Sequence, residues 1–175
     1  AGWWRGCMHP RHGRPFDLVD GRLAWDESAL ASLDLLFARI EAHGMVAAPV
    51  CLWTLTRIDP GQVLSEEQCV EVVTRQTDRW RSPNIAWMLG GDGNYSDPEV
   101  AHRWKRIGRL GLAGHSDRLA TLHPCGTSWT ADSFVKEPWY RFAGIQSGHG
   151  ATDRDLEFLV AGDYLALGER CRCRS

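Results

Sequence analysis

The sequence predicts an α/β protein: a partial (truncated) TIM-type (β/α) barrel with parallel strands. Short apolar runs alternate along the chain with longer amphipathic runs, the pattern of right-handed βαβ units around a parallel sheet. Four of the apolar runs end in polar or aromatic residues, and barrel enzymes place their chemistry at the carboxyl ends of their strands. The chain has 175 residues, whereas a complete eight-stranded barrel typically needs about 250. We therefore expect fewer strands than a complete barrel has.

The first part of the chain is predicted to contain a loop, a helix and a strand. Pro, Gly and His residues punctuate residues 1–20, which we interpret as a strand end followed by a loop. Apolar residues at helical spacing predict a helix from Asp26 to Ala42, with Asp26 as its N-cap and Gly44 as its stop. The continuous apolar run of residues 45–53 is typical of a strand buried on both faces.

Capping signals mark the next two helices. Ser65 and Gln68 have the spacing of a capping box, so a helix is predicted from there to about Arg81. Asp97 stands before a proline and opens a further helix that continues to about Leu112.

The remaining elements are shorter. Apolar runs predict three further strands, at residues 84–89, 118–122 and 141–146. A short helical turn is expected at residues 132–137, a helix at 153–161, and a strand or helix end at 163–167.

Composition and motifs exclude several classes of function. The formal net charge is −2 and the pI is about 6.4, so nothing indicates binding to nucleic acid or to an anionic membrane surface. No apolar run is long enough to span a bilayer. No secretory leader is recognisable, which favours a cytoplasmic location. The sequence has no P-loop, no Gly-x-Ser-x-Gly elbow and no dinucleotide fingerprint, so no cofactor is predicted.

The six cysteines are too sparse for a disulfide scaffold. Cys51 and Cys125 lie in apolar, strand-like surroundings and are expected to be small buried hydrophobes. Cys7 and the two histidines that follow it lack the spacing of a metal site, and the Cys-x-Cys pair near the C-terminus is only a weak metal or redox signal. No metal is predicted.

Three short segments form a specific combination. They are Pro83-Asn84-Ile85-Ala86-Trp87-Met88-Leu89-Gly90-Gly91-Asp92, His123-Pro124-Cys125-Gly126 followed by Ser128 and Trp129, and Gln146-Ser147-Gly148-His149 preceded by the Pro138-Trp139 corner. In order and spacing they resemble the middle strands of the apiosidase-like glycoside hydrolases, and the resemblance covers roughly residues 15–165. It implies a (β/α)8 barrel that cleaves glycosidic bonds in plant or microbial saccharides.

The same resemblance implies a set of site residues. Asp92 would be one of two catalytic carboxylates, and His123, Gln146 and His149 would line the sugar subsite. Trp53 and Trp129 are predicted platforms for sugar rings, whose CH faces are apolar. Taken alone, Asp92 before a glycine would instead indicate a residue that caps a turn.

The second carboxylate is the open question. Glycosidases need two carboxyl groups, about 5 Å apart for retention of configuration and roughly 6.5–9.5 Å apart for inversion. The resemblance places the second, a glutamate, on a strand beyond residue 170, whereas residues 168–175 form a tail unlike the family. Glu169 is the best candidate within the chain, and a carboxylate from a second chain is the alternative. Three other acidic residues are expected to be solvated surface charges: Asp132, Glu137 and Asp163.

Residues 1–175 are expected to form one barrel-derived domain with unpaired strand edges. Proteins usually pair or cover such edges, so we expect a homo-oligomer whose copies complete the barrel. Two alternatives to glycosidase activity remain open: a catalytically impaired barrel that oligomerises and at most binds sugar, and a hydrolase of another bond such as an ester. The predicted partners are a saccharide and a second copy of the chain, with no nucleic acid and no membrane.

Overall fold

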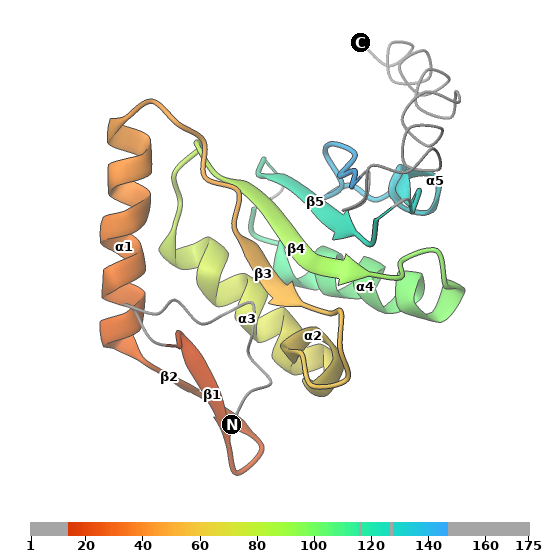
Figure 1. Ribbon diagram of the computed structural model, residues 1–175, viewed down its shortest axis with the longest axis horizontal. Helices are drawn as coiled ribbons and strands as arrows, with labels where there is room; N and C mark the ends of the chain where they lie inside the picture. The colour runs from red at the N-terminus through yellow and green to blue at the C-terminus, as the bar shows by residue number, and fades with distance from the viewer. Residues whose placement is uncertain (1–13, 116, 127, 147–175) are drawn as a thin grey trace.

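A computed structural model describes residues 14–115, 117–126 and 128–146 (Figure 1). Its centre is a parallel sheet of three strands in the order β3-β4-β5, formed by Val50–Trp53, Ala86–Gly93 and Leu119–Pro124. Helix α3 (Glu66–Arg79) connects β3 to β4, and helix α4 (Pro98–Gly111) connects β4 to β5. The two helices contact each other and lie on the same face of the sheet. The described chain therefore contains two consecutive βαβ units, the repeating unit of a (β/α) barrel.

The three long helices begin at the predicted caps. The Asp26 carboxylate accepts hydrogen bonds from two backbone N–H groups at the start of α1 (Glu27–Ala42), at 2.9 and 3.1 Å. Ser65 and Gln68 form the complete capping box of α3. Asp97 caps α4 in the same way as Asp26 caps α1, again at 2.9 and 3.1 Å. Each cap satisfies N–H groups that have no partner inside the helix, so the sequence alone fixes where these helices begin.

The prediction of a plain loop over residues 14–20 is wrong. Strand β1 (Phe16–Val19) pairs antiparallel with β2 (Arg22–Trp25) in a hairpin. Asp20 and Gly21 form its turn, with φ values of 49° and 75°. An Asp-Gly pair at positive φ is the typical two-residue hairpin turn, because its twist matches that of the strands. The signal was present in the sequence, and the prediction missed it.

The strands of the parallel sheet differ in length from the prediction. Strand β3 begins at Val50, and the predicted residues before it contribute one isolated bridge, between Ala47 and Ile85. Pro49 explains the late start, because proline has no N–H to donate to a ladder, although its carbonyl accepts from Met88 N at 3.0 Å. Strand β4 continues to Gly93, beyond the predicted end.

The predicted fourth strand at residues 141–146 is not formed. Tyr140, just before the segment, makes one parallel bridge with Ala120, and Arg141 N donates to Ala120 O at 2.9 Å. Beyond that point the side chain of Thr121 donates to Phe142 O at 2.7 Å. The segment therefore follows β5 through a side-chain hydrogen bond instead of a continuing backbone ladder. The short helical turn is present as α5 (Ala131–Phe134), and another, α2 (Pro60–Val63), follows β3.

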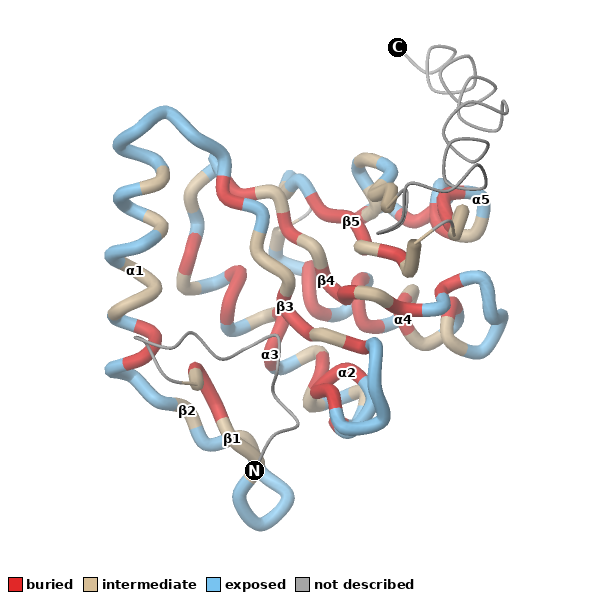
Figure 2. Tube along the Cα trace, viewed as in Figure 1, coloured by how far each residue is buried: buried red, intermediate tan, exposed pale blue. Residues whose placement is uncertain are grey.

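The core lies between the sheet and helices α3 and α4, where buried residues concentrate (Figure 2). Trp87 of β4 stacks on Trp80 at the end of α3, with ring centroids 6.4 Å apart, and Trp104 of α4 is buried against the same sheet. Cys51 and Cys69 are buried free thiols, which confirms the prediction for Cys51. Cys125 is only half-buried, so the prediction of full burial is wrong for it. Its position at the end of β5, where the sheet opens, is the reason.

Candidate functional site

Three of the predicted site residues meet at the carboxyl ends of the parallel strands. Trp53 ends β3, Asp92 lies near the end of β4, and His123 lies near the end of β5. Trp53 and His123 are both in register with Gly91 of the central strand. Their ring centroids are 6.0 Å apart. The sheet therefore brings together residues that are far apart in the sequence.

The carboxylate of Asp92 faces the imidazole of His123. Asp92 Oδ1 lies 3.3 Å from His123 Nδ1, and the two side chains are 12% and 29% exposed. His123 Nδ1 is itself buried, and the contact does not reach full hydrogen-bond geometry. The pair places a largely shielded carboxylate beside an imidazole at the carboxyl ends of the strands.

Glycines in the Gly-Gly-Asp-Gly segment make room for aromatic rings. A Cβ atom on Gly91 would collide with the ring of Trp53, and one on Gly90 or Gly93 would collide with Tyr95. Tyr95 is fully buried, and burial raises the pKa of its phenol, so Tyr95 stays protonated. Because these glycines have no side chain, the rings of Trp53 and Tyr95 can pack closely against the segment that carries Asp92.

Asp92 itself has an uncommon backbone conformation. Its φ is 50°, in the left-handed region that residues other than glycine rarely adopt. Such a conformation costs of order 1–3 kcal/mol and recurs at functional sites, although aspartate adopts it more readily than most residues. Asp97, not Asp92, caps the helix that follows.

Two further predicted residues lie in segments that follow β5. Trp129 is half-buried, and its carbonyl accepts from Ser96 Oγ of the loop after β4 at 3.4 Å. The backbone of Trp129 thus lies at the same end of the strands as Asp92. Gln146 is half-buried at the end of the segment that follows β5. His149 and Glu169 lie outside the described residues, as do residues 153–167 and the tail at 168–175.

The prediction that Glu137 is a solvated surface charge is wrong. Glu137 is buried and accepts two hydrogen bonds from Arg109, at 2.7 and 2.8 Å. Arg109 lies in the last turn of α4, which runs antiparallel to the strands, so this ion pair lies at the end of the sheet away from Asp92. Asp132 is exposed, as predicted, and Asp163 lies outside the described residues.

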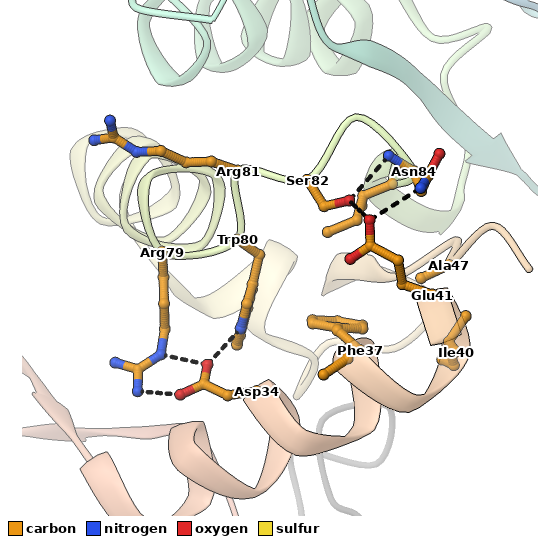
Figure 3. A pocket seen from close by; sticks show the side chains of 12 residues that line it. Asp34, Phe37, Ile40, Glu41, Ala47, Arg79, Trp80, Arg81, Ser82 and Asn84 are labelled. Carbon is orange, nitrogen blue, oxygen red and sulfur yellow. Dashed lines mark hydrogen bonds and ion pairs between the residues drawn. The ribbon is translucent and has the colours of Figure 1, made fainter. Parts of the chain in front are cut away.

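A cavity of about 400 Å³ lies between α1 and the start of β4 (Figure 3). It is next to the amino ends of the strands, opposite Asp92. Arg79 donates to both oxygens of Asp34, at 2.8 and 2.7 Å, and Ser82 and Asn84 donate to Glu41, at 2.9 and 3.0 Å. The acidic side chains that line the cavity are thus paired within the protein, and the pair of Asp34 with Arg79 joins α1 to α3. We therefore place the candidate site at the carboxyl ends of the strands.

The sequence prediction missed one contact in the site. The thiol of Cys125 donates to the carbonyl oxygen of Asp92, with Sγ and O 2.9 Å apart. The sequence places Cys125 directly after the His-Pro pair at a strand end, but the bond itself depends on how β4 and β5 are aligned.

The described part of the chain contains no group of three or more His, Cys, Asp or Glu side chains arranged to hold a metal ion. None of its helices combines the length and apolarity needed to cross a bilayer.

Solved structures with a similar fold are glycoside hydrolases. A family 5 glycoside hydrolase from Bacteroides vulgatus matches with a TM-score of 0.61 and 23% identity over 81% of this chain and 29% of its own. Another glycoside hydrolase matches with a TM-score of 0.59 and 22% identity over 83% of this chain and 33% of its own. The chain thus spans about a third of the length of these structures. At this identity the likeness shows the fold, and the predicted partial (β/α) barrel is confirmed.

Sequence comparisons identify the family. A comparison with curated proteins gives no match. The family model of the apiosidase-like catalytic domain matches residues 26–167, which is most of the chain. The chain belongs to the family of apiosidase-like catalytic domains.

Proposed function

We propose that this chain provides the catalytic carboxylate Asp92 and part of the sugar subsite of a glycoside hydrolase that acts on plant or microbial saccharides. The observation that supports this most is the meeting of Trp53, Asp92 and His123 at the carboxyl ends of three parallel strands. Barrel enzymes carry out their chemistry at this end of the sheet. Family membership supports the same reaction class.

Each of the three residues has a role in the proposal. Asp92 is the catalytic acid or nucleophile, with its side chain largely shielded from solvent. His123 orients the carboxylate and binds sugar hydroxyl groups. Trp53 is half-buried beside it and offers an aromatic face to the sugar ring. Trp129, Gln146 and His149 are proposed to complete the sugar subsite.

The proposed reaction needs a second carboxyl group. Among the described residues, the buried Glu137 is committed to Arg109 at the other end of the sheet and is therefore not a candidate. Glu169 is the proposed partner from this chain, and a carboxylate of another chain or segment is the alternative. The distance between the two groups would decide between retention and inversion.

A second copy of the chain is the proposed partner at the sheet edge. Within residues 14–146, as far as they are described, β3 pairs with β4 alone, so no described strand covers its other side. Met45 and Val46, just before β3, are exposed. Open edges with apolar neighbours tend to pair with other strands. Light scattering after size-exclusion chromatography should give a dimer mass at micromolar concentration, and a monomer throughout would rule the pairing out.

The function is tested by measuring hydrolysis of aryl glycosides and oligosaccharides by the unmodified chain, by Asp92→Asn and by Asp97→Asn. Asp97→Asn is the matched control, because asparagine caps a helix as well as aspartate does and leaves the site untouched. We expect turnover to fall by at least about 10³-fold in Asp92→Asn, as for loss of a catalytic group. Turnover in the control should be unchanged.

The alternatives give different results in the same experiment. If all three proteins lack turnover but bind oligosaccharide in calorimetry, the impaired barrel that only binds sugar is the correct interpretation. If aryl esters are hydrolysed and Asp92→Asn leaves that rate unchanged, the chain is a hydrolase of another bond.

A further inference from the structure

The thiol of Cys125 is joined to the backbone of Asp92. Cys125 Sγ donates to Asp92 O at 2.9 Å, and Cys125 N donates to Gly93 O at 3.2 Å. The residue that follows β5 therefore holds two successive carbonyl groups at the end of β4. Both bonds are made on the side of the sheet opening, beside the carboxylate that faces His123.

The backbone of Asp92 needs such a restraint. Its φ of 50° lies in the left-handed region, which is disfavoured for a residue with a side chain. Gly91 and Gly93 flank it, and glycine has little conformational preference of its own. A change of φ at Asp92 would swing its side chain away from His123. The conformation is therefore held by contacts from outside the segment.

The state of the thiol suits this role. Burial raises the pKa of Cys125, and the negative charge of Asp92 raises it further. Cys125 therefore remains a thiol at neutral pH. Only the thiol form has a hydrogen to donate to a carbonyl oxygen.

We infer that Cys125 is a positioning residue: its S–H bond to the Asp92 carbonyl fixes the left-handed backbone of Asp92 and so aims the carboxylate at His123 and the substrate. The structural part of this inference stands on the geometry alone. Its effect on catalysis rests on the function proposed above. The two parts are therefore tested by separate measurements.

The first measurement is structural and needs no activity. Backbone chemical shifts and the HN–Hα coupling of Asp92 are recorded by NMR for the unmodified chain, Cys125→Ser, Cys125→Ala and the control Cys51→Ala, which removes a thiol from the same sheet. A serine hydroxyl can donate to the same carbonyl, whereas alanine cannot. We expect Asp92 to keep its signals in Cys125→Ser and Cys51→Ala and to shift in Cys125→Ala. Unchanged Asp92 signals in Cys125→Ala would overturn the inference.

The second measurement is kinetic. In Cys125→Ala we expect kcat to fall by about 10- to 100-fold with little change in KM, because small displacements of a catalytic group have effects of this size. Cys125→Ser should recover most of the loss. An equal loss of kcat in Cys125→Ser and Cys125→Ala would show that the hydrogen donated by residue 125 has no role. If the unmodified chain is inactive, the proposed function fails, and the NMR result still decides the structural part.

Discussion

Asp92 Oδ1 and His123 Nδ1 lie 3.3 Å apart at the ends of neighbouring parallel strands. The two residues are not neighbours in the sequence, because helix α4 and two loops lie between them. Their meeting depends on the parallel register that joins Gly91 to His123. The sheet thus acts as the scaffold that turns two separate motifs into one candidate site.

The first prediction concerns His123. Replacing His123 with Phe keeps an aromatic ring beside Trp53 but removes the nitrogen that faces Asp92. We expect turnover of an aryl glycoside to fall by about 10²-fold, the usual scale for loss of a positioned polar group. The thermal midpoint should change little, because phenylalanine keeps a ring of similar size against Trp53. Unchanged turnover would show that the His123 nitrogen has no part in the reaction.

The second prediction concerns Gly91 and the ring of Trp53. A Cβ atom on Gly91 would overlap the ring, so Gly91→Ala should destabilise the protein by about 1–3 kcal/mol, as overpacking does. Urea unfolding would measure this. In a Trp53→Ala background the same substitution should cost less, because the ring is gone, although Val50 also lies close. An identical cost in both backgrounds would mean that Trp53 is not the obstacle.

Local signals predicted much of this fold. Asp26, Ser65 and Asp97 satisfy N–H groups within three residues of themselves, so their sequence neighbourhood determines the helix starts. The hairpin at Asp20-Gly21 was equally local and could have been predicted. Elements of this kind need no knowledge of the rest of the molecule.

Features that depend on distant partners were not predictable. The pairing of Glu137 with Arg109 joins residues 28 positions apart, and nothing near Glu137 in the sequence marks it as buried. Residues 141–146 could form a strand only by pairing with the backbone of β5. The side chain of Thr121 donates a hydrogen bond to Phe142 O in place of that backbone pairing. The left-handed Asp92 and its bond to Cys125 likewise appear only when β4 and β5 are aligned.

The third prediction concerns Gly108 in α4. Glycine is a poor helix residue, and alanine would normally stabilise a helix interior by about 0.5–1 kcal/mol. At Gly108, however, a Cβ atom would overlap the ring of Trp139, which packs on α4. Gly108→Ala should therefore destabilise the protein by roughly 1–3 kcal/mol. The control is Gly114→Ala, where a Cβ atom meets nothing within 4 Å, and its urea midpoint should match the unmodified chain. Stabilisation by Gly108→Ala would contradict the packing of Trp139.

The last prediction concerns pH and the ion pair of Asp34 with Arg79. Hydrogen bonds from Arg79, and then from Trp80, hold the pKa of Asp34 below its ordinary value. Because the pKa is lower in the folded protein than in the unfolded chain, the pair stabilises the fold above about pH 4, the pKa range of an unperturbed aspartate. That stabilisation is lost as the pH falls through the folded pKa.

Asp34→Asn should therefore be less stable than the unmodified chain at pH 7, and the difference should shrink as the pH falls through the folded pKa of Asp34. The effect should be below about 1 kcal/mol, because the Asp34 side chain is 42% exposed and solvent screens the pair. Urea midpoints between pH 2 and pH 7 would measure it. Asp20→Asn is the control, since Asp20 is exposed in the hairpin turn and asparagine tolerates its positive φ. A difference that does not shrink as the pH falls would mean that the substitution acts through packing and not through the charge of the carboxylate.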